Sequence, residues 1–388
     1  MHLFMNALAS SAGGGLTYIR NVLPYFVATA DLRVTVALAP NLRNEFRGSS
    51  MIDFHELDVP VGRRFWYEQS AMSGLIRRCG ADVLLSTGNF ALRNSPVPQV
   101  LLSRNSIYTS ADFYRDLRSR HEYRMWFDTH LRAVMAKRSI HWADRTVAPS
   151  QAFADELSRW TGVHVTAIHH GFDREAFTRD STPLSAQVEE KLRATDGCLR
   201  LLFVSHYNYY RNFETLIRAL PLLRNSLARR SVRLLLTCRL APGENPGSYR
   251  PESAAKLVGS LGVSDMVIEL GAIPYRQLHQ LYKQADVYVT PAYTETFAHP
   301  LVEAMASGLP VVASDLAVHR EICGEAASYF HRFNPEALAE CVLQVGRNAE
   351  KASHMTQLGR ERSRAFSWQA HVGKILEMSR KALNRYAC

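Results

Sequence analysis

The chain has 388 residues, of which 47% are hydrophobic and 21% charged, a composition typical of a globular protein with about two or three domains. Its formal net charge of +10 favours acidic partners such as nucleotide phosphates or an anionic membrane. The positive charge is dispersed and no base-stacking motif appears, so nucleic acid is not expected as a partner. The scattered cysteines argue against a zinc site, and we expect neither a signal peptide nor a membrane-spanning helix.

Short apolar runs alternate with helical patterns in the first half, which predicts a parallel sheet covered by helices. The expected strands are 3–8, 34–38, 81–86, 99–103, 145–150 and 165–170. A cluster of Gly13, Gly14 and Gly15 follows the first strand and precedes a helix expected from about Leu16. Such glycines let backbone N–H groups approach a phosphate at a helix start, or they form only a flexible turn. Both interpretations stay open.

Polar residues follow the strand 99–103, at the end where parallel sheets of this kind bind ligands. Asn105 can exchange hydrogen bonds with ligand hydroxyls but cannot act as a base near pH 7, and its alternative is a loop-capping role. Residues 112–142 are predicted to form one long helical stretch. In it, Tyr123, Phe127, Leu131 and Val134 recur at helical spacing and are expected to face the core.

Several arginines of the same stretch lie largely on other faces, among them Arg115, Arg118, Arg124 and Arg132. A basic amphipathic helix can lie on an anionic membrane. The interspersed Asp116, Glu122 and Asp128 favour an ordinary solvated face instead. Residues 176–198 are polar, contain Pro183 and lack a strand, which predicts a linker. Further strands are expected at 199–205, 233–237, 267–274, 285–290 and 310–314, and an amphipathic helix at 366–383.

The segment 291–315 reads PAYTETFAHPLVEAMASGLPVVASD and joins two of these strands through a helix. Pro300 suits the first turn of that helix, and Gly308 ends it. A helix start is a ready site for phosphate. Glu303, in the first turns, is an ordinary position for an acidic residue. Glu295 is different, because it stands in the loop before the helix, within reach of a ligand's hydroxyl groups.

Glu295 and Glu303 form an E-x7-E pattern that resembles the donor-binding motif of retaining nucleotide-sugar glycosyltransferases, in particular glycosyltransferase family 4, the group 1 enzymes. The resemblance covers nearly the whole chain, most closely 199–388. It implies the α/β GT-B fold, with two Rossmann-like domains facing across a cleft. The implied domains are an acceptor-side domain (1–175), a linker (176–198), a nucleotide-sugar-binding domain (199–366) and a terminal helix that crosses back (367–388).

The resemblance also implies roles for single residues. Glu295 contacts the donor sugar and Glu303 the ribose diol. The segment 206–220 aligns with a block in which two cations neutralise the donor diphosphate, and places His206 and Arg211 at those positions. Arg211, Glu295, His206 and Asn105 are the predicted catalytic residues. The predicted donor-binding residues are Gly13, Gly14 and Gly15 near the phosphates, Gly271, Ala272, Ile273 and Pro274 at the base, and Thr296, Phe297, Ala298, His299, Pro300, Leu301 and Glu303 around the sugar, diphosphate and ribose.

The implied reaction transfers a sugar from a nucleoside diphosphate sugar to a hydroxyl of a glycan, lipid-linked or small-molecule acceptor in glycoconjugate synthesis. It retains configuration and needs no metal, cofactor or protein nucleophile; no D-x-D motif is present. The implied location is the cytoplasm or the inner face of its membrane. The sequence departs from the family pattern with His206 at an Arg position, Arg211 at a Lys position and Ala298 at a Gly position. Because the fold can be shared and the first two departures remove familiar groups, two alternatives stay open. These are a nucleotide-sugar epimerase of GT-B fold and a non-catalytic nucleotide-sugar-binding protein.

Overall fold

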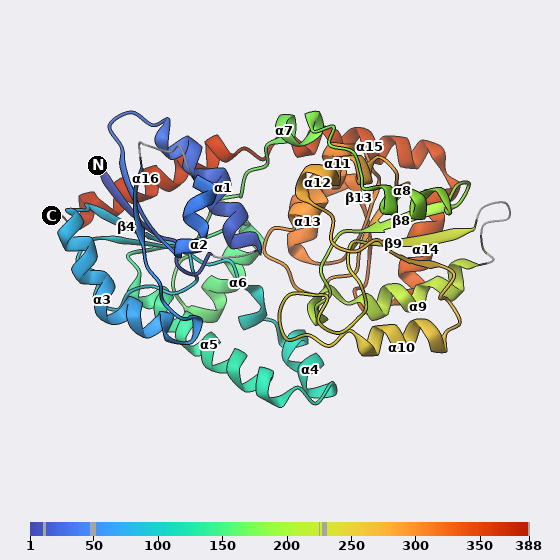
Figure 1. The fold of residues 1–388 in the computed structure, drawn as a ribbon, viewed down its shortest axis with the longest axis horizontal. Helices are drawn as coiled ribbons and strands as arrows, with labels where there is room; N and C mark the ends of the chain where they lie inside the picture. The colour runs from blue at the N-terminus through green and yellow to red at the C-terminus, as the bar shows by residue number, and fades with distance from the viewer. Residues whose placement is uncertain (11–12, 47–51, 225, 227–230, 387–388) are drawn as a thin grey trace. The chain divides into compact units, whose positions relative to one another are not determined.

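The structure is a computed structural model that describes residues 1–10, 13–46, 52–224, 226 and 231–386. The chain divides into two compact units. Unit 1 comprises Met1–Thr109, His121–Gly171 and Phe366–Cys388, and unit 2 comprises Ser110–Arg120 and Phe172–Ala365. Each unit is built on one parallel sheet that is covered by helices (Figure 1).

The sheet of unit 1 has seven parallel strands in the order β3-β2-β1-β4-β5-β6-β7. Their bounds are β1 His2–Asn6, β2 Arg33–Leu38, β3 Ile52–Glu56, β4 Val83–Ser86, β5 Gln99–Leu102, β6 Arg145–Ala148 and β7 Thr166–Ala167. The order reverses between β1 and β4, which is the switch point where Rossmann-like sheets bind ligands. The sequence pattern missed β3, because this strand at the edge of the sheet carries polar side chains between its apolar ones.

Helices pack around the sheet of unit 1 (Figure 1). They are α1 Gly13–Val27, α2 Pro40–Arg43, α3 Arg64–Cys79, α5 Tyr123–Trp142, α6 Gln151–Thr161 and α16 Trp368–Tyr386, with single turns η1 Asn44–Phe46, η2 Val61–Arg63 and η3 Ser106–Tyr108. Tyr18, Val22 and Phe26 repeat every four residues on the buried face of α1. The last helix, α16, adds Trp368 and Ile375 to the same core, although it comes from the far end of the chain.

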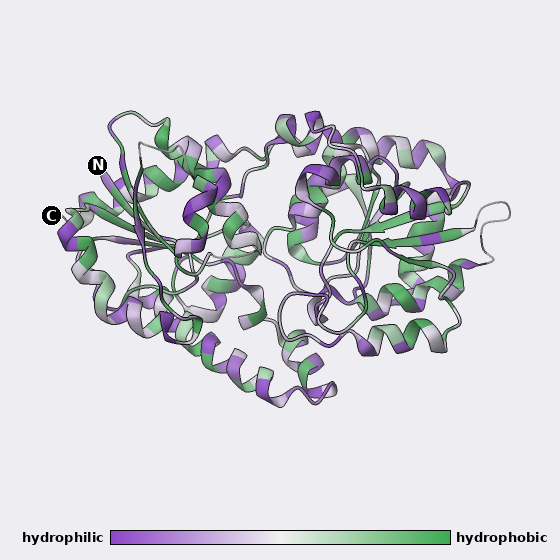
Figure 2. Ribbon diagram, in the orientation of Figure 1, coloured by the Kyte–Doolittle hydropathy of each residue, from purple (hydrophilic) through white to green (hydrophobic). Residues whose placement is uncertain are grey.

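Unit 2 repeats the strand order of unit 1 with six parallel strands, β10-β9-β8-β11-β12-β13. They are β8 Leu199–Phe203, β9 Val232–Leu236, β10 Val267–Glu269, β11 Val287–Thr290, β12 Val311–Ser314 and β13 Ala327–Phe330. Continuous apolar runs are required because helices cover both faces, and these strands are largely green in Figure 2. The switch point of this sheet lies between β8 and β11.

The helices of unit 2 are mostly short. They are α4 Ala111–Ser119, α7 Arg174–Arg179, α8 Ala186–Arg193, α9 Phe213–Arg224, α10 Glu252–Ser260, α11 Tyr275–Tyr282, α12 His299–Ser307, α13 Ala317–Cys323, α14 Pro335–Arg347 and α15 Ala349–Ser363, with single turns η4 Tyr209–Arg211 and η5 Gly324–Ala326. The predicted linker 176–198 therefore needs correction. It contains α8 and most of α7 and belongs to unit 2, where Lys191 donates a hydrogen bond to the carbonyl of Glu269 at 2.6 Å.

The prediction of a single helix over 112–142 is also wrong, because the helical stretch is interrupted between α4 and α5. His121 lies at the break with a φ of 57°. The helix α4 belongs to unit 2 and is held there by ion pairs from Asp112 to Arg332 and from Arg120 to Glu214, both at 2.9 Å. The helix α5 belongs to unit 1.

The face of α5 that was expected to be buried is exposed instead. Tyr123, Phe127, Leu131 and Val134 are 61%, 65%, 51% and 40% exposed. The buried face of α5 consists mainly of small side chains, Thr129, Ala133, Ala136 and Ser139, together with Ile140. Small residues let a helix approach its neighbours closely, so this narrow face packs inward and leaves the larger apolar side chains outside. None of the helices in the described ranges combines the length and hydrophobicity that crossing a bilayer requires.

Candidate functional site

Two loops meet at the switch point of unit 2, and each carries one predicted catalytic residue. Because β8 pairs with β11, the segments that follow these strands leave the sheet side by side. Arg211 comes from the first segment and Glu295 from the second. Their side chains form an ion pair, in which Nη1 of Arg211 donates to Oε2 of Glu295. The structure therefore brings together two residues that are 84 positions apart in the sequence.

The ion pair between Arg211 and Glu295 is mostly removed from water, with side-chain exposures of 21% and 12%. Burial alone would raise the pKa of Glu295. The positive charge of Arg211 and a hydrogen bond from the Thr296 N–H outweigh burial and hold this pKa below its ordinary value. Burial likewise opposes the charge on Arg211, but the carboxylate of Glu295 outweighs it and raises the pKa of Arg211. Both side chains are therefore ionised at neutral pH.

Arg211 still has hydrogen-bonding capacity to offer a ligand. Its Nε is buried and has no hydrogen-bond partner among the described residues. A buried N–H without a partner is costly, and a phosphate oxygen satisfies it well. The guanidinium of Arg211 is thus paired with Glu295 at one end and has an N–H without a partner among the described residues at the other.

Two asparagines that the sequence analysis did not single out hold Arg211 in place. The Oδ1 of Asn208 accepts a hydrogen bond from the Arg211 N–H at 3.1 Å and caps η4. Asn212 adopts a left-handed backbone with φ 56°, and its Nδ2 donates to the carbonyl of Pro291 at 3.0 Å. This bond ties the segment after β8 to the segment after β11. The signal in the sequence was the pair of asparagines around Arg211, since Asn favours caps and left-handed turns.

His206, the other predicted cation, is exposed beside Arg211. Partial burial and the charge of Arg211 both lower the pKa of His206 below its ordinary value. At neutral pH the imidazole is therefore mostly uncharged. Arg211 is the permanent cation of this block, and His206 contributes a hydrogen-bonding ring rather than a second charge.

Glu303, on α12, is buried with an exposed fraction of 5%. It takes no part in the ion pair between Arg211 and Glu295. The hydroxyl of Tyr282 donates to its Oε2 at 2.9 Å. Burial raises the pKa of Glu303 to about 7, although the Tyr282 hydrogen bond opposes the rise. This carboxyl therefore changes charge near neutral pH, and it is able either to donate or to accept a hydrogen bond.

Ala298 marks the start of α12 with an unusual backbone. Its φ of 63° and ψ of 62° lie in the left-handed region, which glycine adopts at little cost and alanine does not. The adjoining Phe297 is buried, its ring 4.8 Å from that of His299, and the Leu301 N–H bonds to the Ala298 carbonyl at 3.0 Å. Ala298 thus keeps the backbone that a glycine would adopt here.

The predicted base-binding segment, Gly271–Pro274, follows β10 at the carboxyl end of the same sheet. Gly271 has a φ of 82°, and Pro274 precedes the first residue of α11. Ala272 and Pro274 are exposed. The segment therefore offers an open backbone turn on the edge of the sheet that also carries Arg211 and Glu295.

His319 is a fully buried residue near Glu295 that no sequence motif indicated. Its Nδ1 bonds to the carbonyl of Ser314 at 3.0 Å, while its Nε2 has no partner among the described residues. Burial lowers the pKa of His319 to about 4, against the opposing effect of the Glu295 charge. His319 is therefore a neutral ring within the electrostatic reach of Glu295. A lone histidine carries no sequence signal for such a place.

The switch point of unit 1 is closed by small residues. The hydroxyls of Ser10 and Thr87, which follow β1 and β4, are 3.1 Å apart. A Cβ added at Gly15 would lie 2.9 Å from the Cα of Ser10, whereas one at Gly14 meets nothing within 4 Å. The glycines form the first turn of α1, which begins at Gly13 rather than near Leu16. Residues 11–12 of the predicted glycine-rich loop lie outside the described residues.

Arg104 links this switch point to β5. Its guanidinium donates to the carbonyl of Gly14 at 3.0 Å and to that of Thr87 at 2.7 Å. Burial lowers the pKa of Arg104 to about 10, partly offset by Tyr18. The neighbouring Asn105 takes the capping role: its Oδ1 accepts from the Ile107 N–H at 3.3 Å at the start of η3. Its predicted contact with a sugar stays a prediction.

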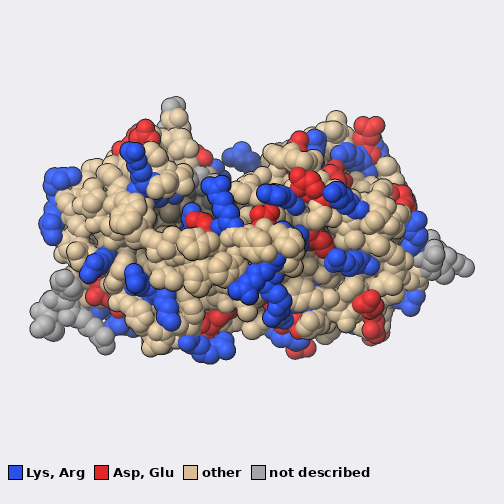
Figure 3. All heavy atoms as spheres, turned by 90° about the horizontal axis from the view of Figure 1, so that it is seen from below, with Lys and Arg blue, Asp and Glu red and all other residues tan. Residues whose placement is uncertain are grey.

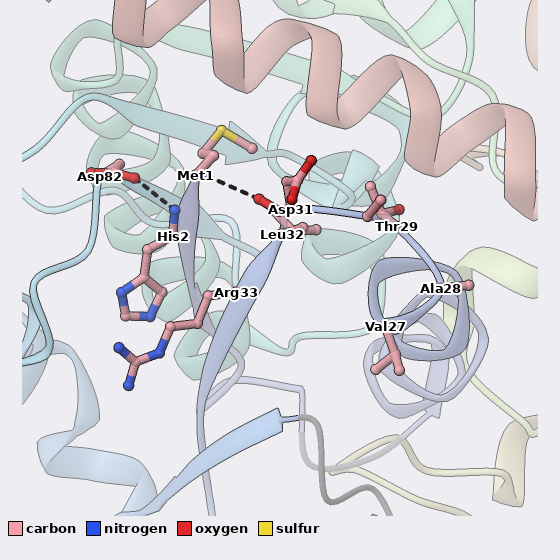
Figure 4. A pocket seen from close by; sticks show the side chains of 10 residues that line it. Met1, His2, Val27, Ala28, Thr29, Asp31, Leu32, Arg33 and Asp82 are labelled. Carbon is pink, nitrogen blue, oxygen red and sulfur yellow. Dashed lines mark hydrogen bonds between the residues drawn. The ribbon is translucent and has the colours of Figure 1, made fainter.

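Two further observations concern other parts of the units. A hollow of about 610 Å³ (Figure 4) is lined by residues such as Met1, Asp31 and Asp82. It lies at the amino ends of β1 and β2, whereas sheets of this kind bind ligands at the carboxyl ends. Among the described residues there is no cluster of three His, Cys, Asp or Glu side chains that could hold a metal ion.

Two doubly wound parallel sheets, each with a polar switch point, define an α/β protein with two Rossmann-like domains. Residues 186–362 match the family described as Glycosyl transferases group 1, and residues 12–176 match the family described as Glycosyltransferase Family 4. The chain belongs to this group 1, or family 4, class of glycosyltransferases.

The chain is similar in sequence to two bacterial enzymes. It is 24% identical over 262 residues to the D-inositol 3-phosphate glycosyltransferase of Streptomyces coelicolor, covering 63% of this chain and 56% of the relative. It is 30% identical over 162 residues to the MMP alpha-(1->4)-mannosyltransferase of Mycolicibacterium hassiacum, and this match covers 41% of this chain and 38% of the relative. The chain thus spans well under two thirds of the length of these relatives.

The fold is similar to solved structures over nearly its whole length. Sucrose-phosphate synthase from Thermosynechococcus elongatus has a TM-score of 0.78 at 19% identity, covering 99% of this chain and 100% of that one. The Anabaena protein HepE in complex with UDP-glucose has a TM-score of 0.71 at 17% identity, and the match covers 97% of this chain and 99% of that one. Identity this low shows the fold alone, and that fold is GT-B.

Proposed function

We propose that the protein is a retaining glycosyltransferase that moves a sugar from a nucleoside diphosphate sugar to an acceptor hydroxyl. The observation that carries this proposal is the buried pair of Arg211 and Glu295 at the switch point of unit 2. The two side chains are paired with each other. A bound donor offers a diphosphate to the first and sugar hydroxyls to the second, and so replaces both halves of the pair.

The chemistry of the pair suits a departing diphosphate. Negative charge grows on the leaving oxygen as the glycosidic bond breaks, and a fixed cation in a mostly dry site stabilises it. Arg211 supplies that cation, and its Nε, which has no partner among the described residues, supplies a donor. Asn208 and Asn212 hold the backbone on either side of that side chain. In the proposed retaining reaction the acceptor attacks the face that the diphosphate leaves, and a donor phosphate oxygen takes its proton. The scheme uses neither a protein nucleophile nor a metal.

The remaining donor contacts follow the same sheet edge. Glu303 accepts hydrogen bonds from the ribose diol, with Tyr282 holding its carboxyl in place. The turn at Gly271–Pro274 receives the base. UDP-glucose is the nucleotide sugar bound in the similar HepE structure, so a UDP-sugar is the first donor to test. The acceptor is a hydroxyl of a glycan, a lipid-linked sugar or a small polyol, and we place the reaction in the cytoplasm.

The test is donor turnover by wild type and by variants of Arg211. Thermal shifts with UDP-, GDP- and dTDP-sugars identify the donor, and release of nucleoside diphosphate is then measured with and without acceptor. Arg211→Ala should lower turnover about 100-fold, the cost of one preorganised donor, and Arg211→Lys should recover part of it. Arg218→Ala changes an exposed arginine on α9 and is the matched control.

Three outcomes would contradict the proposal. Near wild-type turnover by Arg211→Ala would remove the arginine from the reaction. Release of nucleoside diphosphate without any acceptor, together with a change in configuration of the donor sugar, would indicate an epimerase. Donor binding without turnover across many acceptors would indicate a binding protein. The anomeric configuration of the product, read by NMR, tests retention separately.

A further inference from the structure

The helix α5 presents an apolar stripe to solvent instead of to the core. Tyr123, Phe127, Leu131 and Val134 recur at intervals of four, four and three residues, so they lie on one side of the helix. At a rise of 1.5 Å per residue the stripe is roughly 16 Å long. All four side chains are at least 40% exposed, and the opposite face of α5 is the one that packs into unit 1. The stripe is therefore a continuous apolar surface and not a few scattered residues.

The charges around this stripe are mostly positive. Between Tyr123 and Trp142 the helix has four basic residues and one acidic residue, Asp128. Asp128 is already paired with Arg132 at 2.8 Å. The other cations, Arg124, Lys137 and Arg138, are exposed, and at 3.6 residues per turn Arg124 and Arg138 lie beside the apolar stripe. Figure 3 views the protein from below Figure 1 and shows Lys and Arg side chains, with some Asp and Glu, around uncharged surface.

We propose that α5 is the surface by which unit 1 docks on an anionic lipid membrane. An interfacial helix needs an apolar face that enters the boundary between headgroups and acyl chains, and cations that contact the anionic headgroups. The stripe supplies the first and the flanking basic residues supply the second. The inference concerns a partner outside the proposed reaction, and it holds whichever sugar the enzyme transfers.

A second copy of the chain fits this surface less well. In a two-fold symmetric pair the same patch meets itself, so the two α5 helices would lie side by side across the axis. Arg124, Lys137 and Arg138 of one copy would then face the same cations of the other, with one acidic residue per helix to compensate. Like charges at an interface are repulsive, whereas an anionic bilayer neutralises all of them at once.

The test is sedimentation of the full chain with vesicles at low salt. We compare pure phosphatidylcholine with mixtures in which about a third of the lipid is phosphatidylglycerol, as anionic lipid supplies the surface charge. The protein should sediment with the anionic vesicles and be released at high salt. The double variant Arg124→Gln/Arg138→Gln should lower the partition coefficient roughly 25-fold, at about fivefold for each basic side chain near the surface.

A second variant tests the apolar stripe. Phe127→Ser/Leu131→Ser should reduce partitioning by roughly 100-fold, about tenfold for each large apolar side chain that no longer leaves water. Since both side chains are exposed, the thermal melting of the protein should hardly change. Matched controls are Lys374→Gln/Arg380→Gln, which neutralises exposed cations on α16, and Leu222→Ser, which removes an exposed apolar side chain from α9. Both should partition like wild type.

Other results would overturn the proposal. No sedimentation at low salt removes the membrane as partner. If the protein binds neutral vesicles as well as anionic ones, the cations have no role. If the α16 control loses as much binding as the α5 variants, the binding is not specific to α5. Sedimentation equilibrium without lipid decides the rival occupant: a dimer that Phe127→Ser/Leu131→Ser converts to monomer would assign the stripe to a second copy.

Discussion

Breaking the pair of Arg211 and Glu295 should destabilise unit 2 even without a ligand. Removing either partner leaves the other as a mostly buried charge without compensation. For a fully buried pair this costs about 3–5 kcal/mol, and for an exposed one up to about 1 kcal/mol. With side-chain exposures of 21% and 12%, the pair lies near the buried limit, so we expect about 3 kcal/mol for Arg211→Ala and for Glu295→Ala.

The assay is thermal and urea unfolding of wild type, both single variants and the double variant. A loss of about 3 kcal/mol lowers the melting temperature of a domain of about 200 residues by roughly 6–12 °C. Arg211→Ala/Glu295→Ala should lose about as much as either single variant, because no charge is then left alone, which gives a coupling energy of about 3 kcal/mol. The control is Arg179→Ala, which breaks an exposed pair with Glu175 (78% and 75% exposed) and should change stability little.

The pH dependence adds a check on the cause. Since the pKa of Glu295 is lowered in the folded chain, its contribution is fully present above the ordinary glutamate pKa and is lost as the pH falls through the lowered one. The difference between wild type and Glu295→Ala should therefore shrink in acid. Additive losses in the double variant, or single variants that melt with wild type, would refute the reasoning that the two charges compensate each other in a dry site.

Three further predictions concern single residues. Ala298→Gly should raise the free energy of unfolding by about 1 kcal/mol, because it relieves an alanine at φ 63°; an unchanged urea midpoint would contradict this. Gly15→Ala should cost about 1–3 kcal/mol, since the new Cβ meets the backbone of Ser10, whereas Gly14→Ala in the same helical turn should be neutral or stabilising; equal effects in urea unfolding would refute the close approach. The raised pKa of Glu303, about 7, means that its contribution to stability is present below the ordinary glutamate pKa and lost as the pH rises through 7. Stability should therefore fall by up to about 3 kcal/mol across that range in wild type and stay flatter in Glu303→Gln, and parallel pH profiles would remove the assignment.

Much of the fold could be predicted from the sequence because the strands of a doubly wound sheet are continuous apolar runs. The alternation of strands and helices predicts a doubly wound parallel sheet in each half, whereas the order of the strands and the two switch points come from the structure. The strands that escaped, β3 and β13, lie at the edges of their sheets, where a strand needs less apolar surface. For the site, Arg211 and Glu295 were readable through the resemblance of the segments 206–220 and 291–315 to motifs of the family. Asn208 and Asn212 showed only the general preference of Asn for caps and left-handed turns. His319 showed no signal, because its place depends on burial.

The helical region 111–142 shows where local pattern stops being sufficient. Its sequence has one helical period throughout, yet α4 belongs to unit 2 and α5 to unit 1. The bonds that decide this connect Asp112 to Arg332, Asp116 to Tyr293 and Arg120 to Glu214, across 220, 177 and 94 positions. The spacing of apolar residues along a helix cannot predict contacts between residues so far apart in the sequence. The same limit applies to α5, where two stripes of helical spacing compete to face inward. The stripe of small residues is buried because it packs more closely, and the larger apolar side chains are left exposed on the surface that we assign to a membrane.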